Sequence, residues 1–234
     1  MNNGVEFSSQ LLKTAIKEFH FFLEDKPESM DPISLNSLIN KLQEIDIDKI
    51  RQEEERIAFW INIYNALKIY LILTKKISNN ALSHYQGQFL FNFKIGNWRF
   101  NLAQIKHGIL RHNQPPPFIP LKTFKQSDER TYFAPATPNS KIIFALSDLT
   151  ISSPKIAIYD AYHLDFQLSQ AQQLFVSDNF IYDIEFKRLA YSPIFKWYAK
   201  DFPNQFLKDP QFVPFHKTQL PYNFKNYQTV SIPT

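Results

Sequence analysis

The segment from Ile57 to Leu73 constrains the fold of this chain more than any other part of the sequence. Its apolar residues leave almost no polar face on a helix, and Asn62, Asn65 and Lys68 interrupt it. It falls short of the roughly 20 apolar residues that a helix needs to cross a bilayer. A helix that is apolar all round is buried in a core. We therefore expect a buried helix in a globular fold, with no membrane span.

Apolar residues at helical spacing predict five further helices, and the central helix is expected to extend from about residue 48 to about residue 75. Pro27 closes the first helix, and Asn101 can cap the helix that begins at Leu102. The predicted helices, in chain order, span residues 11–23, 33–45, 48–75, 102–111, 164–175 and 192–202.

Three segments are typical of strands. Apolar and polar residues alternate on both sides of Gly96-Asn97, which predicts a β-hairpin over residues 89–101. Residues 180–184 and 187–191 predict a second hairpin. Lys141 to Ser147 is β-branched and apolar, as expected of a central strand. The predicted class is α+β, with N-terminal helices packed against a small, mostly antiparallel sheet built from the hairpins and the central strand.

Residues 112–140 are rich in proline, including Pro115-Pro116-Pro117, and predict a long irregular excursion. A loop of this length inside a domain usually covers another part of the fold or moves. No linker or repeat divides the chain, and its 234 residues, 44% of them hydrophobic, are enough for one substantial core. We expect residues 1–234 to form a single domain.

The composition excludes several kinds of chemistry. The chain has no cysteine, which excludes disulfides, thiolate nucleophiles and iron–sulfur ligation. Its four glycines never form a phosphate-binding loop, and no H-E-x-x-H motif occurs, so we expect no nucleotide cofactor and no metal. The net charge of +4 comes from scattered basic residues. That distribution permits nucleic acid as a partner but does not indicate it.

The N-terminal residues MNNGVEFSSQLLK lack the basic start, apolar stretch and cleavage site of a secretory signal. The chain as it stands is therefore expected to be cytoplasmic. If a signal peptide has been removed, the expected compartment is periplasmic or extracellular.

Two amides on the buried helix are candidates for a ligand-binding role. Asn62 and Asn65 lie three residues apart and share one helix face. Buried amides need partners, because an unsatisfied one costs about 1–3 kcal/mol. In one interpretation they bind the backbone of neighbouring loops; in the other they orient a substrate or a catalytic imidazole.

His107 and Arg111 lie four residues apart and should stack on one side of their helix. In one interpretation His107 is a general base and Arg111 binds an anion beside it, with Arg111 lowering the pKa of His107. In the other, they are a surface histidine and arginine without a functional role, which have the same spacing on an amphipathic helix.

The stretch FALSDLTISSP, Phe144 to Pro154, follows the expected central strand and supplies Asp148, Ser152 and Ser153. Loop residues after a strand are often presented to an active site. No G-x-S-x-G elbow surrounds Ser153, and Ser-Pro is common in ordinary turns.

Four segments together resemble the family known as domain of unknown function 547. These are Ala58 to Leu67 (AFWINIYNAL), Ile105 to Arg111 (IKHGILR), Phe144 to Pro154 and Tyr191 to Tyr198. Their order and spacing agree over roughly residues 50–225, which the resemblance implies to be the core of the domain, with residues 1–48 as an N-terminal helical extension.

The resemblance also implies a thiol-hydrolase-like site built from cysteines and a histidine. This chain carries Asp148 and Ser153 where the family has cysteines, and Lys106 where a glutamate precedes the histidine. It is therefore similar to a member of the family that has lost its thiols and the chemistry they supply, while His107, Arg111, Asn62 and Asn65, and with them the cleft, remain.

Three hypotheses on function follow. The preferred one is a non-catalytic module that binds a ligand or another protein on an enzyme-like cleft. The expected partner is a small molecule or a peptide, with Asn62, Asn65 and Arg111 as ligand-binding residues. The alternative is a hydrolase or acyltransferase in which His107 works with Ser153 or Asp148. The third, a nucleic-acid or anionic-surface binder, rests only on scattered charge, and we do not expect nucleic acid as a partner.

Overall fold

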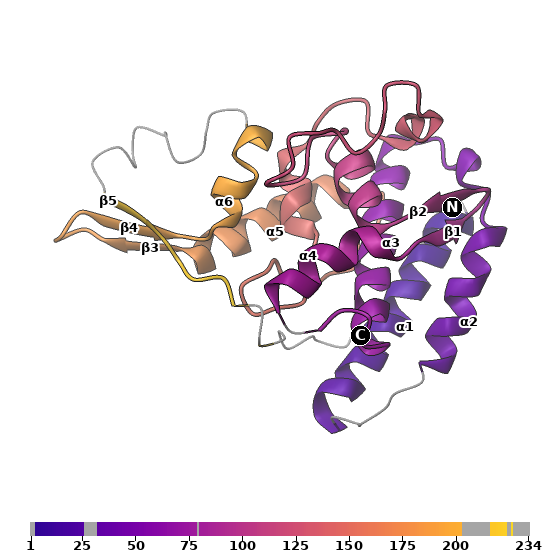
Figure 1. The fold of residues 1–234 in the computed structure, drawn as a ribbon, viewed down its shortest axis with the longest axis horizontal. Helices are drawn as coiled ribbons and strands as arrows, with labels where there is room; N and C mark the ends of the chain where they lie inside the picture. Colours follow the sequence, from indigo (N-terminus) through magenta and orange to yellow (C-terminus); the bar gives the residue numbers. More distant parts are fainter. Residues whose placement is uncertain (1–2, 26–31, 79, 203–215, 224–225, 227–234) are drawn as a thin grey trace.

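The computed structural model describes residues 3–25, 32–78, 80–202, 216–223 and 226. Helices form most of the molecule, and two small sheets lie at separate places on it (Figure 1). The α+β class predicted from the sequence is confirmed. The helices are α1 Asn3–Asp25, α2 Ile33–Lys41, α3 Glu53–Leu73, α4 Ala81–Leu90, α5 Leu164–Asn179 and α6 Ile194–Trp197.

The apolar helix α3 is buried on every side from Ile57 to Ile69, as predicted. It begins at Glu53 rather than near residue 48, and Glu53, Glu54 and Glu55 place negative charge at the positive end of the helix dipole. Helix α1 packs along it (Figure 1), and apolar residues of both belong to the main hydrophobic cluster. Pro27, predicted to close the first helix, lies outside the described residues.

Helix α4 was not predicted. Asn80 caps it, because its side chain accepts a hydrogen bond from the backbone N–H of Ser83 at 2.8 Å. The helix occupies residues 89 and 90, so the first hairpin is shorter than the alternation predicted. Its strands, β1 Phe93–Ile95 and β2 Trp98–Phe100, pair antiparallel around Gly96, whose φ of 56° suits a residue without a Cβ.

The central strand predicted for Lys141 to Ser147 is wrong. Residues Ser140–Ala145 form a 3₁₀ helix, whose first turn is capped by the Asn139 side chain accepting from the N–H of Lys141 at 3.0 Å. Ile142, Ile143 and Phe144 are buried there. A short apolar run is compatible with a buried strand or a buried helical segment, and periodicity alone does not separate the two.

The second hairpin has the strands predicted for it, β3 Phe180–Asp183 and β4 Arg188–Tyr191. Strand β5 His216–Gln219, which was not predicted, pairs parallel with β4 and makes this sheet mixed. The hairpin extends away from the helical body (Figure 1). Its base packs on α5, α6 and the 3₁₀ helix in a second, aromatic cluster that includes Phe144, Phe175, Phe180, Phe195 and Phe202.

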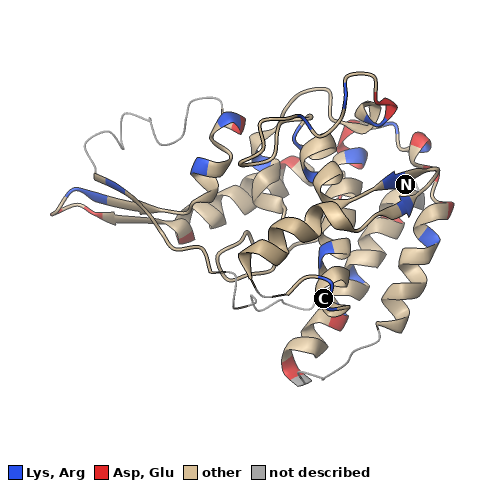
Figure 2. Ribbon diagram, viewed as in Figure 1, with Lys and Arg blue, Asp and Glu red and all other residues tan. Residues whose placement is uncertain are grey.

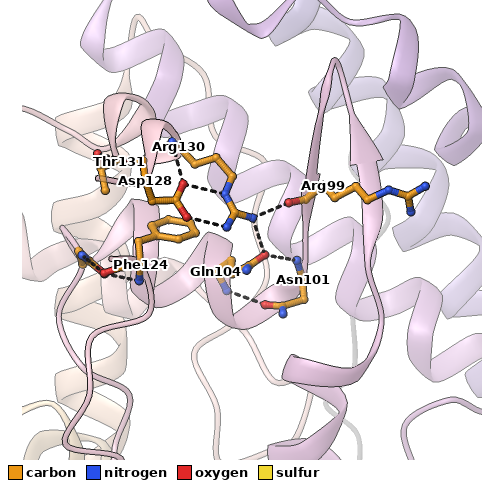
Figure 3. Close-up of polar contacts among 8 residues, drawn as sticks. Arg99, Asn101, Gln104, Phe124, Asp128, Arg130 and Thr131 are labelled. Atoms are coloured by element: carbon orange, nitrogen blue, oxygen red, sulfur yellow. Dashed lines mark hydrogen bonds and ion pairs between the residues drawn. The ribbon is translucent and has the colours of Figure 1, made fainter. Parts of the chain in front are cut away.

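The proline-rich excursion is anchored by Arg130 (Figure 3). Its guanidinium donates to both carboxylate oxygens of Asp128, to the carbonyl oxygen of Arg99 at 2.8 Å and to Oε1 of Gln104 at 3.2 Å. Asn101 and Gln104 form a reciprocal capping box, as each side chain accepts from the other's backbone N–H. Arg130 therefore ties the excursion to the first hairpin and to the start of the helix that carries His107.

Lysine, arginine and acidic residues are dispersed over the helices, loops and hairpin (Figure 2). Within the described ranges, no helix combines the length and hydropathy that a membrane crossing requires.

Candidate functional site

The helix predicted after Asn101 continues as a π-helix over Gln104–Leu110. Its wide turns are seen in the hydrogen bonds from Arg111 N to Lys106 O and from Asn113 N to Gly108 O, both at 3.0 Å. Helices of this type are rare in proteins, and those that occur are often found at functional sites. Here the π-helix carries Lys106 and His107, both of them buried.

Arg111 holds His107, as their spacing predicted. Its Nη1 atom donates to Nδ1 of His107 at 2.6 Å and to the carbonyl oxygen of Pro115 at 3.0 Å. Its Nε and Nη2 atoms bind both carboxylate oxygens of Asp201 at 2.5 and 2.9 Å. Because a guanidinium only donates, Nδ1 accepts, and the neutral ring carries its proton on Nε2.

Two histidines of the site are held in the neutral form. Burial, the Arg111 guanidinium and Lys106 hold the pKa of His107 well below its ordinary value. The prediction that Arg111 lowers this pKa is confirmed. Burial, followed by the charge of Lys68, lowers the pKa of His84 to about 4.

Asp148 is the acidic member of the site. The Nζ atom of Lys68, whose side chain is fully buried, lies 3.3 Å from Oδ1 of Asp148, and the hydroxyl of Tyr222 donates to Oδ2 at 3.4 Å. Burial acts to raise the pKa of Asp148, but Lys68 and then Lys106 outweigh it and hold the pKa well below its usual range. The carboxylate is therefore ionised, and the neighbouring lysines already compensate its negative charge.

Lys106 lies between two aromatic rings. Its Nζ atom is 5.2 Å from the ring centroid of Tyr198 and 5.7 Å from that of Tyr64, within the range of cation–π attraction. The Arg111 guanidinium lies 4.6 Å from the Tyr198 centroid, and the His107 ring stacks on the same tyrosine. Tyr198 therefore links the two basic residues to the imidazole.

A pocket of about 640 Å³ opens beside these groups. Helix α4, the π-helix, the excursion, the turn at Asp148 and the end of α6 each contribute to it. Its polar residues include His84, Gln88, His107 and Asp148, and its walls are otherwise largely aromatic and aliphatic. The lining residues of the walls are Ala81, Leu82, Tyr85, Pro117, Phe118, Trp197 and Tyr198.

The two helix asparagines bind loop backbone, as the structural interpretation of them required. Asn62 donates to the carbonyl oxygen of Tyr159 at 2.8 Å and accepts from its N–H at 3.0 Å. Asn65 donates to the carbonyl oxygen of Ala145 at 2.9 Å and accepts from the N–H of Ser147 at 3.1 Å. Both side chains are completely buried, and neither lines the pocket.

Ser153 closes a turn. Its Oγ donates to the carbonyl oxygen of Thr150 at 2.8 Å and accepts from the N–H of Thr150 at 3.1 Å. It lines a different pocket, beside α5, and Ser152 accepts from the N–H of Asn223 at 2.8 Å. Of the residues proposed for catalysis, His107 and Asp148 share one pocket and Ser153 does not.

Sequence reasoning missed His84, Gln88 and Asp201. His84 and Gln88 lie on α4, whose weak apolar pattern gave no helix signal. Asp201 is 90 residues from Arg111 along the chain, and no local pattern pairs them. In the parts of the chain that the structure describes, no three His, Asp or Glu side chains gather as a metal site would require.

Comparison with known proteins gives one family. The profile of a protein family of unknown function, DUF547, matches residues 47–176, which is more than half of the chain. That range contains α3, the π-helix with His107, and the turn with Asp148. No curated protein and no solved structure matches the sequence. The chain therefore belongs to the DUF547 family, as a member without cysteine.

Proposed function

We propose that this protein binds a small organic molecule in the pocket between α4, the π-helix and α6, and that it does so without catalysing a reaction. The observation that carries the proposal is the pocket itself, whose 640 Å³ is within the range of ligand sites. Aromatic walls with a few polar groups at one place are the usual composition of such sites.

The contacts of His107 and Ser153 support binding rather than hydrolysis. A general base needs a ring nitrogen that is free to accept a proton, but Nδ1 of His107 is bound by Arg111 and Nε2 carries hydrogen. The Ser153 hydroxyl is bound to the backbone of its own turn. Neither arrangement resembles a nucleophile beside a base.

Fragment binding tests the proposal. A set of phenyl, indole and cyclohexyl fragments is screened by saturation-transfer NMR with the wild-type protein and with the variant Leu82→Arg. Leu82 lines the pocket and is 63% exposed, so the arginine should obstruct the pocket without disturbing the core. Leu90→Arg is the matched control, because Leu90 is on the same helix, is 65% exposed and lies outside the pocket lining.

We expect fragments that bind the wild type and Leu90→Arg but not Leu82→Arg. Absence of any such fragment would overturn the proposed site. Hydrolysis of ester surrogates by the purified protein, abolished in His107→Ala, would overturn the non-catalytic part of the proposal.

A further inference from the structure

We propose that the ligand of this pocket carries an uncharged head group with a hydrogen-bond donor and an acceptor side by side, as a carboxamide does. The inference rests on the proposed function and adds the chemical class of the ligand. It comes from the polar groups that line the pocket and from the charges directly behind them.

The donor of the site is His107. Arg111 binds Nδ1 at 2.6 Å, and Asp201 in turn fixes the guanidinium through two hydrogen bonds. The ring therefore offers Nε2–H, which can donate to a carbonyl oxygen but cannot supply a full positive charge. A carbonyl of the ligand matches it better than an ammonium does.

The acceptor of the site is Asp148. Its carboxylate carries a charge, whereas the other side chains that line the pocket are neutral. The Nζ atom of Lys68 lies 3.3 Å from its Oδ1 atom. Because Lys68 and Lys106 already neutralise the carboxylate, a ligand cation would gain little from it. A ligand carboxylate would face a carboxylate directly. A neutral N–H group satisfies the remaining lone pairs without either cost.

The rest of the lining also disfavours an ion. His84 is neutral near pH 7, because burial and Lys68 keep its pKa near 4. The walls contributed by Leu82, Phe118 and Trp197 offer no counter-charge. Moving an ion out of water into such surroundings carries a large desolvation cost.

Three probes with one apolar body test the head group. These are 3-phenylpropanamide, 3-phenylpropanoate and 3-phenylpropylammonium, titrated into wild-type protein at pH 7.5 by saturation-transfer NMR, with Leu82→Arg as the blocked reference. We expect the amide to bind about tenfold more tightly than either ion, since each ion loses a hydrogen bond and is desolvated. Equal binding of all three, or preference for an ion, would overturn the inference and leave the proposed function intact.

A change in the probe tests the acceptor without the risk of unfolding the protein, and a variant tests the donor. N,N-dimethyl-3-phenylpropanamide keeps the carbonyl group and loses both N–H groups, so it should bind about tenfold more weakly than the primary amide. In His107→Phe, whose ring cannot donate, the primary amide should lose about the same factor. If the probes bind with undiminished affinity in both experiments, neither Asp148 nor His107 forms a hydrogen bond with the head group.

Discussion

The Nζ atom of Lys68 lies 3.3 Å from the carboxylate of Asp148, and the lysine side chain has no exposed surface. Removing one partner of a buried ion pair costs about 3–5 kcal/mol, because the other charge stays buried. We expect Asp148→Asn to lower the free energy of unfolding by that amount, since it leaves two lysines behind. Lys68→Met should cost less, because Lys106 still faces Asp148. Urea denaturation measures both.

The exposed pair Lys141–Asp165 provides the control, as the side chain of Asp165 is 87% exposed. Asp165→Asn should cost about 1 kcal/mol or less. The double variant Lys68→Met, Asp148→Asn should recover part of the loss. If Asp148→Asn were no more costly than Asp165→Asn, the buried pair would not stabilise the fold.

Gly108 packs closely against the aromatic ring of Phe124. A Cβ at this position would lie 2.2 Å from Cε2 of Phe124, so Gly108→Ala must displace the ring or the π-helix. We expect a loss of about 1–3 kcal/mol in stability, and weaker fragment binding because His107 is the neighbouring residue. Thermal unfolding and the NMR screen measure the two effects.

Gly4→Ala is the matched control for Gly108→Ala. Its Cβ would lie 3.0 Å from the Cδ1 end of Ile50, a flexible side chain that can move, and 3.4 Å from Cγ2 of Ile45, which is an ordinary contact. Combining Gly108→Ala with Phe124→Leu should restore part of the stability. A Gly108→Ala protein as stable as Gly4→Ala would contradict the close packing.

His84 should make stability depend on pH. Its pKa is about 4 in the folded protein and near 6.5 when unfolded, so between these values the unfolded chain binds more protons. The free energy of unfolding should therefore fall as pH falls from 6.5 to 4, by about 1.4 kcal/mol per pH unit for this group. His107, whose pKa is also lowered, adds to the fall.

In His84→Gln the slope of the free energy of unfolding against pH should be smaller, because about one proton fewer is taken up on unfolding. Urea denaturation at half-unit steps from pH 8 to pH 4 measures this slope for both proteins. The difference in free energy of unfolding between the wild type and His84→Gln at pH 8 is the reference. Parallel curves for the two proteins would show that His84 is not held neutral by the fold.

The asparagines of α3 should differ in their effect on the pocket. Asn62→Ala and Asn65→Ala each leave a backbone N–H and a C=O unsatisfied in the core, at about 1–3 kcal/mol per group. Only Asn65 holds Ser147, the residue before Asp148. We therefore expect both variants to be destabilised, while fragment affinity falls in Asn65→Ala alone.

The exposed helix cap Asn80 is the comparison for both asparagines, because Asn80→Ala removes one cap hydrogen bond and should cost about 1 kcal/mol. Stability is read from chemical denaturation and affinity from the NMR screen. Equal loss of affinity in Asn62→Ala and Asn65→Ala would contradict a specific role for Asn65.

Much of the fold follows from local patterns. The unbroken apolar surface of α3 predicts its burial, and the turn residues Gly96-Asn97 predict the first hairpin. The strand predicted for residues 141–147 is wrong, because a short buried apolar run has no period that separates a strand from a helical segment. Strand β5 depends on pairing with β4, which no local pattern encodes.

The site divides in the same way. The spacing of His107 and Arg111 predicts their contact, since both lie on one helix. The partners Asp201 and Lys68 come from elements distant in sequence, so their contacts depend on tertiary packing. No local pattern shows that the Ser153 hydroxyl binds the backbone of its own turn, so the sequence alone leaves this serine as a candidate nucleophile.

The π-helix makes the site depend on chain length as well as on residue identity. A π turn closes hydrogen bonds over five residues where an α turn closes them over four. A chain one residue shorter between Asn101 and Arg111 could rewind as an ordinary helix and keep its N-terminal cap. When the missing residue lies before Lys106, His107 would be rotated by roughly 100° about the helix axis, away from the pocket that it lines together with Asp148. A single deletion there would dismantle the site while every side chain that forms it is still encoded.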